Sequence, residues 1–255
     1  MKNILLLCLI LTGTFFACEN EPDDFQPDYG FDYFPAEIGT VRHYEVDTVY
    51  FRISNPRYDT TRTQLQEILT NTLLNNAGDT IIRVERSERL AAEDAWQITD
   101  IYSEQIDFQN IYRKEENVRF LKLALPPTVN KTWDGNAEIP EDKNVSVAGE
   151  NIEMFKSWDY RILSAGEPET VNGYDFDDVL TVQLADSDSE IEYRYGIEKY
   201  ARGVGLIYRE LRILDTQCKA CCNAPDGTIP IECTVLPWDE RADEGFIMIQ
   251  QYTEF

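Results

Sequence analysis

Histidine is nearly absent from this chain, in which His43 is the only one among 255 residues. It lies in a strand-like run between Arg42 and Tyr44, and the sequence has no Gly-x-Ser-x-Gly motif that would supply a nucleophile. The glycines Gly203 and Gly205 also lack the third glycine of a dinucleotide-binding loop. We therefore expect no catalytic residue, no enzymatic activity and no cofactor.

Positive charge is scarce as well. The chain has 23 lysines and arginines against 47 aspartates and glutamates, which gives a net charge of −24. A surface of this sign repels phosphate backbones and anionic headgroups. The composition therefore excludes nucleic acid as an expected partner, and any membrane attachment has to come from something other than a basic face.

The N-terminus supplies such an attachment. Lys2 precedes an apolar run from Ile4 to Ala17, which is shorter than the roughly 20 residues that span a bilayer as a helix. This pattern predicts an export signal over residues 1–17. The sequence Phe15-Phe16-Ala17-Cys18 resembles the bacterial lipobox. The resemblance implies that the Cys18 thiol is diacylated and that the acyl chains anchor the protein in membrane lipid.

Residues 18–33 are rich in acidic side chains and proline, a composition typical of an extended linker. The acidic residues directly after Cys18 resemble the surface-export signal of Bacteroidota lipoproteins. This resemblance implies a place at the outer membrane, with the domain exposed on the cell surface; a periplasm-facing domain is the alternative.

The remaining chain, residues 34–255, has the patterns of β-strands. Tyr44, Val46, Thr48 and Tyr50 recur at period two within residues 40–53, and residues 64–74 and 80–86 form a predicted hairpin around Gly78. Helical spacing also fits residues 65–73, but threonine content favours a strand. Further strands are predicted at 96–103, 108–114, 118–125, 154–163, 179–184, 191–195, 205–214 and 246–252.

Between these strands we expect a helical turn at 90–95, a turn at 131–136 and a polar loop at 140–149. Many strands with little helical patterning indicate a mainly β, single antiparallel domain, whether a curved sheet, a barrel or a sandwich.

Four cysteines of the mature chain lie together in a predicted loop at 216–234: Cys218, Cys221, Cys222 and Cys233. In an oxidising envelope such an even set predicts two disulfides. Adjacent cysteines bond each other only in a strained ring, so the pairings 218–221 with 222–233 and 218–222 with 221–233 stay open. A zinc site is the weaker alternative, because the second Cys-x₂-Cys pair is missing.

Two other groups are candidate binding residues. Asp186, Asp188 and Glu190 alternate like part of a calcium loop, although the glycine and the final glutamate of an EF-hand are missing, so a polar hairpin tip is the favoured interpretation and no metal is expected. Trp133 and Trp238 lie in turn-like sequence, where exposed indoles can stack on sugar rings.

Residues 34–39, 131–136 and 200–210 are similar to segments of uncharacterised Bacteroidota lipoproteins, a resemblance that implies a shared fold and no particular activity. The favoured hypothesis is a lipid-anchored envelope protein that binds or assembles at the outer membrane, with a protein complex or a glycan as partner. One alternative is a carrier of an apolar ligand or lipid in a β cavity. The other is a carbohydrate-active enzyme that uses two carboxylates.

Overall fold

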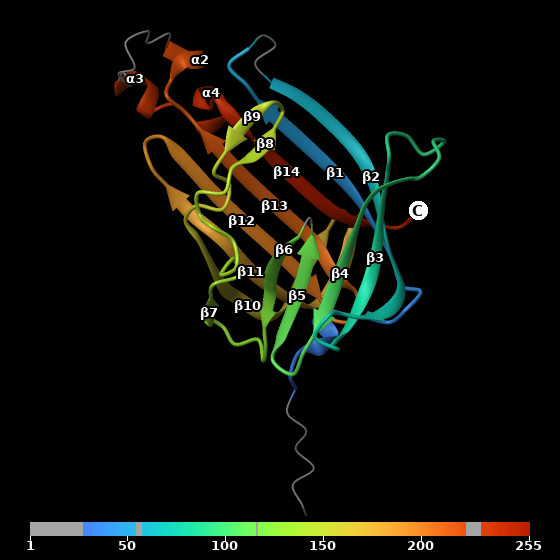
Figure 1. The fold of residues 1–255 in the computed structure, drawn as a ribbon. Helices are drawn as coiled ribbons and strands as arrows, with labels where there is room; N and C mark the ends of the chain where they lie inside the picture. Colours follow the sequence, from blue (N-terminus) through green and yellow to red (C-terminus); the bar gives the residue numbers. More distant parts are fainter. Residues whose placement is uncertain (1–27, 55–57, 116, 223–230) are drawn as a thin grey trace, which may run out of the picture.

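The computed structural model describes residues 28–54, 58–115, 117–222 and 231–255. Their main strands are β1 (Val41–Phe51), β2 (Tyr58–Leu74), β3 (Thr80–Arg89), β4 (Gln97–Ile106), β5 (Asn110–Glu115), β6 (Val118–Ala124), β7 (Thr132–Trp133), β10 (Trp158–Val171), β11 (Tyr174–Asp188), β12 (Glu192–Ala201), β13 (Gly205–Asp215) and β14 (Glu244–Thr253). All of them join one twelve-stranded antiparallel sheet in the order β6-β5-β4-β3-β2-β1-β14-β13-β12-β11-β10-β7. The sheet curls into a nearly closed barrel (Figure 1), which confirms the predicted fold class.

Alternation along each strand decides which side chains line the inside. In β1, Arg42, Tyr44, Val46 and Thr48 are buried, while the residues between them are half-buried. Successive side chains of a strand point to opposite faces, so this period of two separates an enclosed inner face from an outer face. The inner core is rich in tyrosine and aliphatic side chains, among them Tyr160 and Leu180.

Two meanders meet in the sheet because its last strand pairs with its first. Val46 of β1 lies opposite Gln250 of β14, and Leu211 of β13 lies opposite Met248. The segments at 205–214 and 246–252, each predicted as a strand, thus lie side by side. At the remaining seam, the Leu121 N–H donates to the Gly135 carbonyl at 2.9 Å. These contacts bring β6 beside the segment that contains β7.

The lower end of the barrel in Figure 1 is filled by residues that precede β1. The 3₁₀ turn η2 (Phe31–Tyr33) places Tyr33 in the core at 2% exposure. Arg202 holds this segment by donating to Asp28 at 2.8 Å and to Asp178 at 2.7 Å. The chain therefore already packs against the barrel within residues 28–33, which the sequence analysis assigned to the linker.

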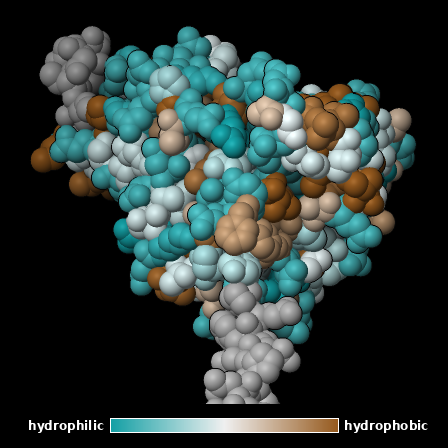
Figure 2. All heavy atoms as spheres, turned by 60° about the horizontal axis from the view of Figure 1, so that its bottom comes forward, coloured by the Kyte–Doolittle hydropathy of each residue, from teal (hydrophilic) through white to brown (hydrophobic). Residues whose placement is uncertain are grey.

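The surface at that end carries scattered hydrophobic side chains among hydrophilic ones (Figure 2). Phe108, in the turn between β4 and β5, is 71% exposed and lies 5.7 Å from the Tyr29 ring. None of the described helices is long and apolar enough to cross a membrane.

At the upper end, three short helices connect β13 to β14: α2 (Lys219–Cys222), α3 (Ile231–Thr234) and α4 (Trp238–Arg241). This segment covers an outer apolar cluster in which Phe51, Leu214 and Ala242 are buried. A separate hairpin of β8 (Val145–Val147) and β9 (Glu150–Ile152) also lies at the upper end (Figure 1). Ile152, at 1% exposure, anchors that hairpin in the inner core.

Three local expectations were wrong. Residues 90–95 form a turn without helix, in which Asp94 donates its N–H to the Ala91 carbonyl. The turn at 131–136 contains the short strand β7, and the polar loop at 140–149 contains β8. The strand β7 forms by pairing with the distant β10 and β8 by pairing with β9, and a local pattern contains no information about either partner.

Candidate functional site

A cavity of about 700 Å³ lies inside the barrel, between the inner face of the sheet and the β8–β9 hairpin. The exposed residues in its lining, Thr99, Asn144 and Ser146, mark its mouth. One wall carries charged side chains and another carries aromatic and aliphatic ones. The volume falls within the roughly 300–1,000 Å³ typical of sites for small organic ligands.

Glu198 of β12 is the centre of the charged wall. Its side chain is 0% exposed, and one carboxylate oxygen accepts from Lys122 Nζ and from Arg209 Nε, each at 2.7 Å. The Tyr200 hydroxyl donates to the other oxygen. The strand β6 thus meets the consecutive strands β12 and β13, which are distant from it in the sequence, at one buried carboxylate.

A second group of charges continues this wall across β3, β4 and β5. Arg86 donates to Glu67 at 2.9 Å and to Glu115 at 3.0 Å. Arg113 donates to the buried carboxylate of Glu104 at 2.9 Å. Both guanidinium groups also lie over the Tyr102 ring, at 4.9 and 4.6 Å from its centre. The inner face therefore holds a connected network of ion pairs, which costs desolvation energy that an apolar core would avoid.

The surrounding charges fix the protonation states of the carboxylates. Burial alone would raise the pKa of Glu67, but Arg113, Arg86 and Arg42 outweigh it and lower that pKa to about 2. The pKa values of Glu115 and Glu198 are also lowered, because nearby lysine and arginine charges overcome burial. At neutral pH these three carboxyl groups are ionised.

Lys122 shows the opposite balance. Burial lowers its pKa to about 8, even though Glu198 acts to raise it. The positive charges of Arg209 and Arg113 add to the lowering. Burial therefore outweighs the ion pair with Glu198 at this end of the cavity.

The opposite wall is a run of aromatic rings. The ring of Phe155 lies 5.8 Å from those of Phe120 and Trp158, and Trp158 lies 6.0 Å from Tyr160. Trp158 is oriented by its indole N–H, which donates to the Met154 carbonyl. Trp158 lies within the strand predicted at 154–163, where the local pattern assigns it no role; the folded sheet places it in the cavity lining.

The β8–β9 hairpin separates this cavity from a second hollow of about 620 Å³. Val145, Ser146 and Met154 line both spaces, so the two adjoin beneath the hairpin. The second hollow is lined by Phe246 and Met248 of β14 together with polar side chains such as Thr48, Arg52 and Asp59.

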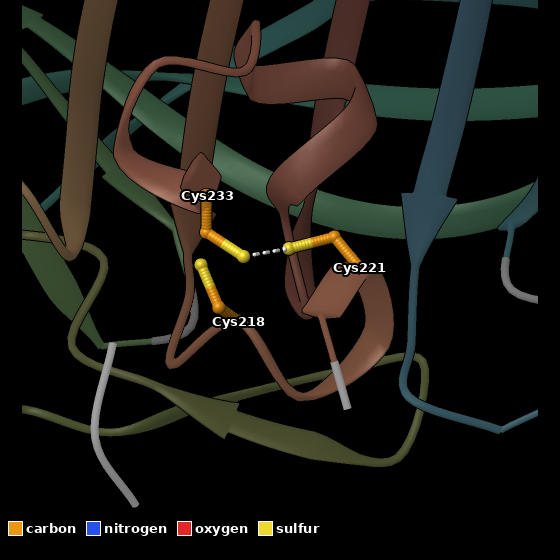
Figure 3. A group of neighbouring side chains, drawn as sticks. All are labelled: Cys218, Cys221 and Cys233. Atoms are coloured by element: carbon orange, nitrogen blue, oxygen red, sulfur yellow. Dashed lines mark hydrogen bonds between the residues drawn. The ribbon is translucent and has the colours of Figure 1, made fainter. Parts of the chain in front are cut away.

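The cysteine group (Figure 3) lies elsewhere, in the segment of α2 and α3 at the upper end of Figure 1. The sulfurs of Cys218, Cys221 and Cys233 lie within 4.8 Å of one another, and those of Cys221 and Cys233 are 3.0 Å apart. The Cys222 side chain lies outside the described part of the structure. Three of the four cysteines that were predicted to form disulfides therefore lie together. The two possible disulfide pairings remain predictions.

Neither predicted tryptophan lines the cavity. Trp133 packs in the seam, where its indole donates to the Leu121 carbonyl at 2.9 Å. Trp238 lies on the outside, with the Arg241 guanidinium 3.8 Å from its ring centre and Tyr193 stacked at 5.5 Å. Both indoles are thus engaged in contacts within the chain.

The acidic triplet forms an exposed hairpin end between β11 and β12. Asp186, Asp188 and Glu190 are all exposed, and Asp188 accepts from the Trp238 indole at 3.0 Å. Among the described residues, only the cysteine group gathers three potential metal-ligating side chains, so the triplet does not converge on one point. Cys18 lies outside the described residues, and its lipidation remains a prediction.

The lowered carboxylate pKa values predict how stability depends on acid. Because Glu67, Glu115 and Glu198 have pKa values below their usual range, their contribution is present above about pH 4.5 and is lost as the pH falls towards about 2. Each unit of lowering corresponds to about 1.4 kcal/mol. Urea unfolding between pH 7 and 2 in 1 M salt, which screens surface charges, should show this decline. A free energy of unfolding that stays constant from pH 4.5 to 2.5 would contradict it.

No protein-family model matches the sequence, and no curated protein matches it. Two crystal structures are similar to it in shape. One is a candidate lipoprotein from Parabacteroides distasonis, with 11% identity and a TM-score of 0.36 over 90% of this chain and 99% of that one. The other is a candidate exported protein with a YmcC-like fold from Bacteroides fragilis, with 8% identity and a TM-score of 0.32 over 87% of this chain and 98% of that one.

Proposed function

We propose that this protein is a non-catalytic binding protein of the cell envelope, anchored at the outer membrane through Cys18, which holds a small molecule inside its barrel. The observation that carries the proposal is the cavity of about 700 Å³ with a charged wall facing an aromatic one. Such sites combine apolar surface for affinity with a few placed polar groups for orientation. Of the three hypotheses from the sequence, the carrier of a small ligand agrees best with this geometry.

The cost of the charged wall supports a binding role. Replacing a buried ion-pair network by well-packed apolar residues is often neutral or stabilising. Glu198, Glu67 and Glu104 are nevertheless fully buried beside the cavity. A ligand that contacts the accessible atoms of this ion-pair network would explain why the charges are present, since the fold alone does not need them.

An enzyme with two working carboxylates is less well supported. A glycosidase needs one carboxyl group with a raised pKa to donate a proton. The pKa values of Glu115 and Glu198, which both line the cavity, are lowered by neighbouring cations. Both groups are therefore poor proton donors at neutral pH.

The position of the mouth agrees with an anchored binding protein. The β8–β9 hairpin beside the mouth lies at the upper end of Figure 1, whereas the 3₁₀ turn η2, which follows the linker, lies at the lower end. A domain attached by its N-terminal linker would thus turn the cavity away from its point of attachment.

The test is native mass spectrometry of the full chain extracted from its own membranes without added ligand. We expect an extra mass on the order of a few hundred daltons that is lost on denaturation. Leu211→Trp, which fills the cavity, should abolish that mass, whereas Leu163→Trp, at a site that is 41% exposed on β10, should retain it. A wild-type chain that carries no small molecule and crosslinks instead to a membrane protein would favour an assembly role.

A further inference from the structure

We infer that the cavity selects an amphipathic anion: one carboxylate or phosphate group at the deep end beside Arg209 and Lys122, and a long apolar chain that runs along the aromatic wall. This inference rests on the proposed function and specifies its ligand class. It follows from the depth of the charges, from the unused hydrogen-bond donors and from the direction of the apolar walls.

The charges that line the cavity are sorted by depth. The side chains of Arg113, Lys122 and Arg209 are only 3%, 8% and 13% exposed. Glu115 and Asp100 are more accessible, at 25% and 28%. Glu198 is the one carboxylate that lines the cavity among the deep cations. At the bottom of the cavity, Lys122 and Arg209 share the single carboxylate of Glu198, so an anion that enters meets a local excess of positive charge there.

Several donors at the deep end are unused. Within the described residues, Arg209 donates from Nε to Glu198 and weakly from Nη1 to Gln250, and its Nη2 has no hydrogen-bond acceptor. Lys122 Nζ donates to Glu198, which leaves further N–H groups of the ammonium. In contrast, both carboxylate oxygens of Glu198 already accept hydrogen bonds. The deep end is thus rich in donors and poor in acceptors, and a carboxylate or phosphate supplies the missing acceptors.

Arg113 is a third cation of the cavity lining. It is 3% exposed, and its Nε and Nη1 atoms have no hydrogen-bond partner in the described chain. Buried donors of this kind carry an unmet desolvation cost. The Arg113 charge is already paired, with Glu104 at 2.9 Å, Glu115 at 3.5 Å and Glu67 at 3.9 Å, so the inferred headgroup site rests on Arg209 and Lys122.

The apolar walls define the path along which the apolar chain of the ligand would lie. Leu184 and Leu211 lie beside the deep charges, and Phe155, Trp158 and Met154 continue the apolar lining towards the hairpin. Met154 also lines the second hollow, whose far wall contains Met248. A single extended chain can therefore run from Arg209 past Trp158 and beneath the hairpin, and the bound chain would remove this apolar surface from water.

Ligands with the same chain and different headgroups provide a direct test. We would measure binding of dodecanoate, dodecyl phosphate, dodecanol and dodecyltrimethylammonium to the full lipidated chain in nanodiscs, with empty nanodiscs as the blank. The two anions should bind about ten-fold or more tightly than the alcohol, and the ammonium should bind most weakly. The comparison of dodecanoate with dodecyl phosphate distinguishes a fatty-acid head from a phosphate head.

The outcomes separate the two proposals. Equal binding of the alcohol and the anions would overturn the inferred selectivity and leave cavity binding intact. Failure of all four probes to bind would overturn both the inference and the proposed function. Neither result depends on a variant, so a variant that folds poorly does not affect the decision.

A matched pair of variants locates the headgroup. Arg209 and Arg212 lie on the same strand, but Arg209 lines the cavity and Arg212 donates to Glu210 on the outer face. Arg209→Gln should weaken dodecanoate binding about ten-fold and leave dodecanol binding unchanged. Arg212→Gln should change neither. Equal loss for acid and alcohol in a folded Arg209→Gln protein would show that the arginine supports the cavity wall without binding the anion.

Discussion

Replacing Glu198 by glutamine is expected to lower the free energy of unfolding by about 3–5 kcal/mol, the cost typical of removing one partner of a buried ion pair. Glu198 is 0% exposed and accepts hydrogen bonds from both Lys122 and Arg209. Glutamine keeps the shape of the side chain but removes its negative charge. Lys122 and Arg209 would then remain in the barrel interior without this negative partner. Urea denaturation followed by circular dichroism measures the loss.

Two controls separate a buried charge from a general effect of the substitution. Glu138 pairs with Arg119 at 2.8 Å on the surface, where its side chain is 56% exposed, so Glu138→Gln should cost less than about 1 kcal/mol. Adding Lys122→Met to Glu198→Gln should restore part of the stability, because the double variant removes one of the unmatched cations. A loss below about 1 kcal/mol in Glu198→Gln would mean that water reaches this site and screens its charges.

The fold was largely predictable because burial of one face imposes period two on a strand. Tyr44, Val46 and Thr48 show that period in the sequence, and the same residues are buried in β1. The segment at 65–73 was ambiguous between helix and strand, and threonine content gave the correct choice. The sequence did not distinguish a barrel from a sandwich, since closure depends on how far the sheet curls and on contacts at the seam.

The candidate site was not predictable, and the reason lies in the charged strand residues. Lys122 and Glu198 are 76 positions apart in the chain, and Arg42 and Glu104 are 62 apart. A charged residue in a strand is normally taken to face water, and the chain has many of them. A signal was present at Lys122, which stands between Leu121 and Leu123, but its meaning depends on a partner that only the folded sheet brings close.

The tryptophans show the same limit. Trp133 and Trp238 stood out because turn-like sequence surrounds them, yet they pack against the chain itself. Trp158 lies in a strand and lines the cavity. Local sequence context indicates whether a side chain lies in a turn, whereas a place beside a cavity depends on the curvature of the whole sheet.

Cys18→Ser is expected to move the protein from the membrane pellet to the soluble fraction. If the thiol of Cys18 carries acyl chains, each buried methylene contributes about 0.8 kcal/mol to membrane binding, and two or more chains give a stable anchor. The net charge of −24 opposes binding to anionic headgroups, so the folded domain should not hold to the membrane by itself. Fractionation with immunoblotting measures the shift, and intact mass measures the acyl groups directly.

The same variant should unfold at the temperature of the wild type, because the described contacts of the barrel involve residues from Asp28 onward. Arg202 still holds Asp28 and Asp178 at the lower end, and the cysteine group at the upper end involves other sulfurs. Cys218→Ser is the matched control: it removes a cysteine from the described domain and should leave membrane fractionation unchanged. A Cys18→Ser protein that stays in the pellet after a high-salt wash would show that another surface binds the membrane. One that misfolds would show that Cys18 is part of the folded structure.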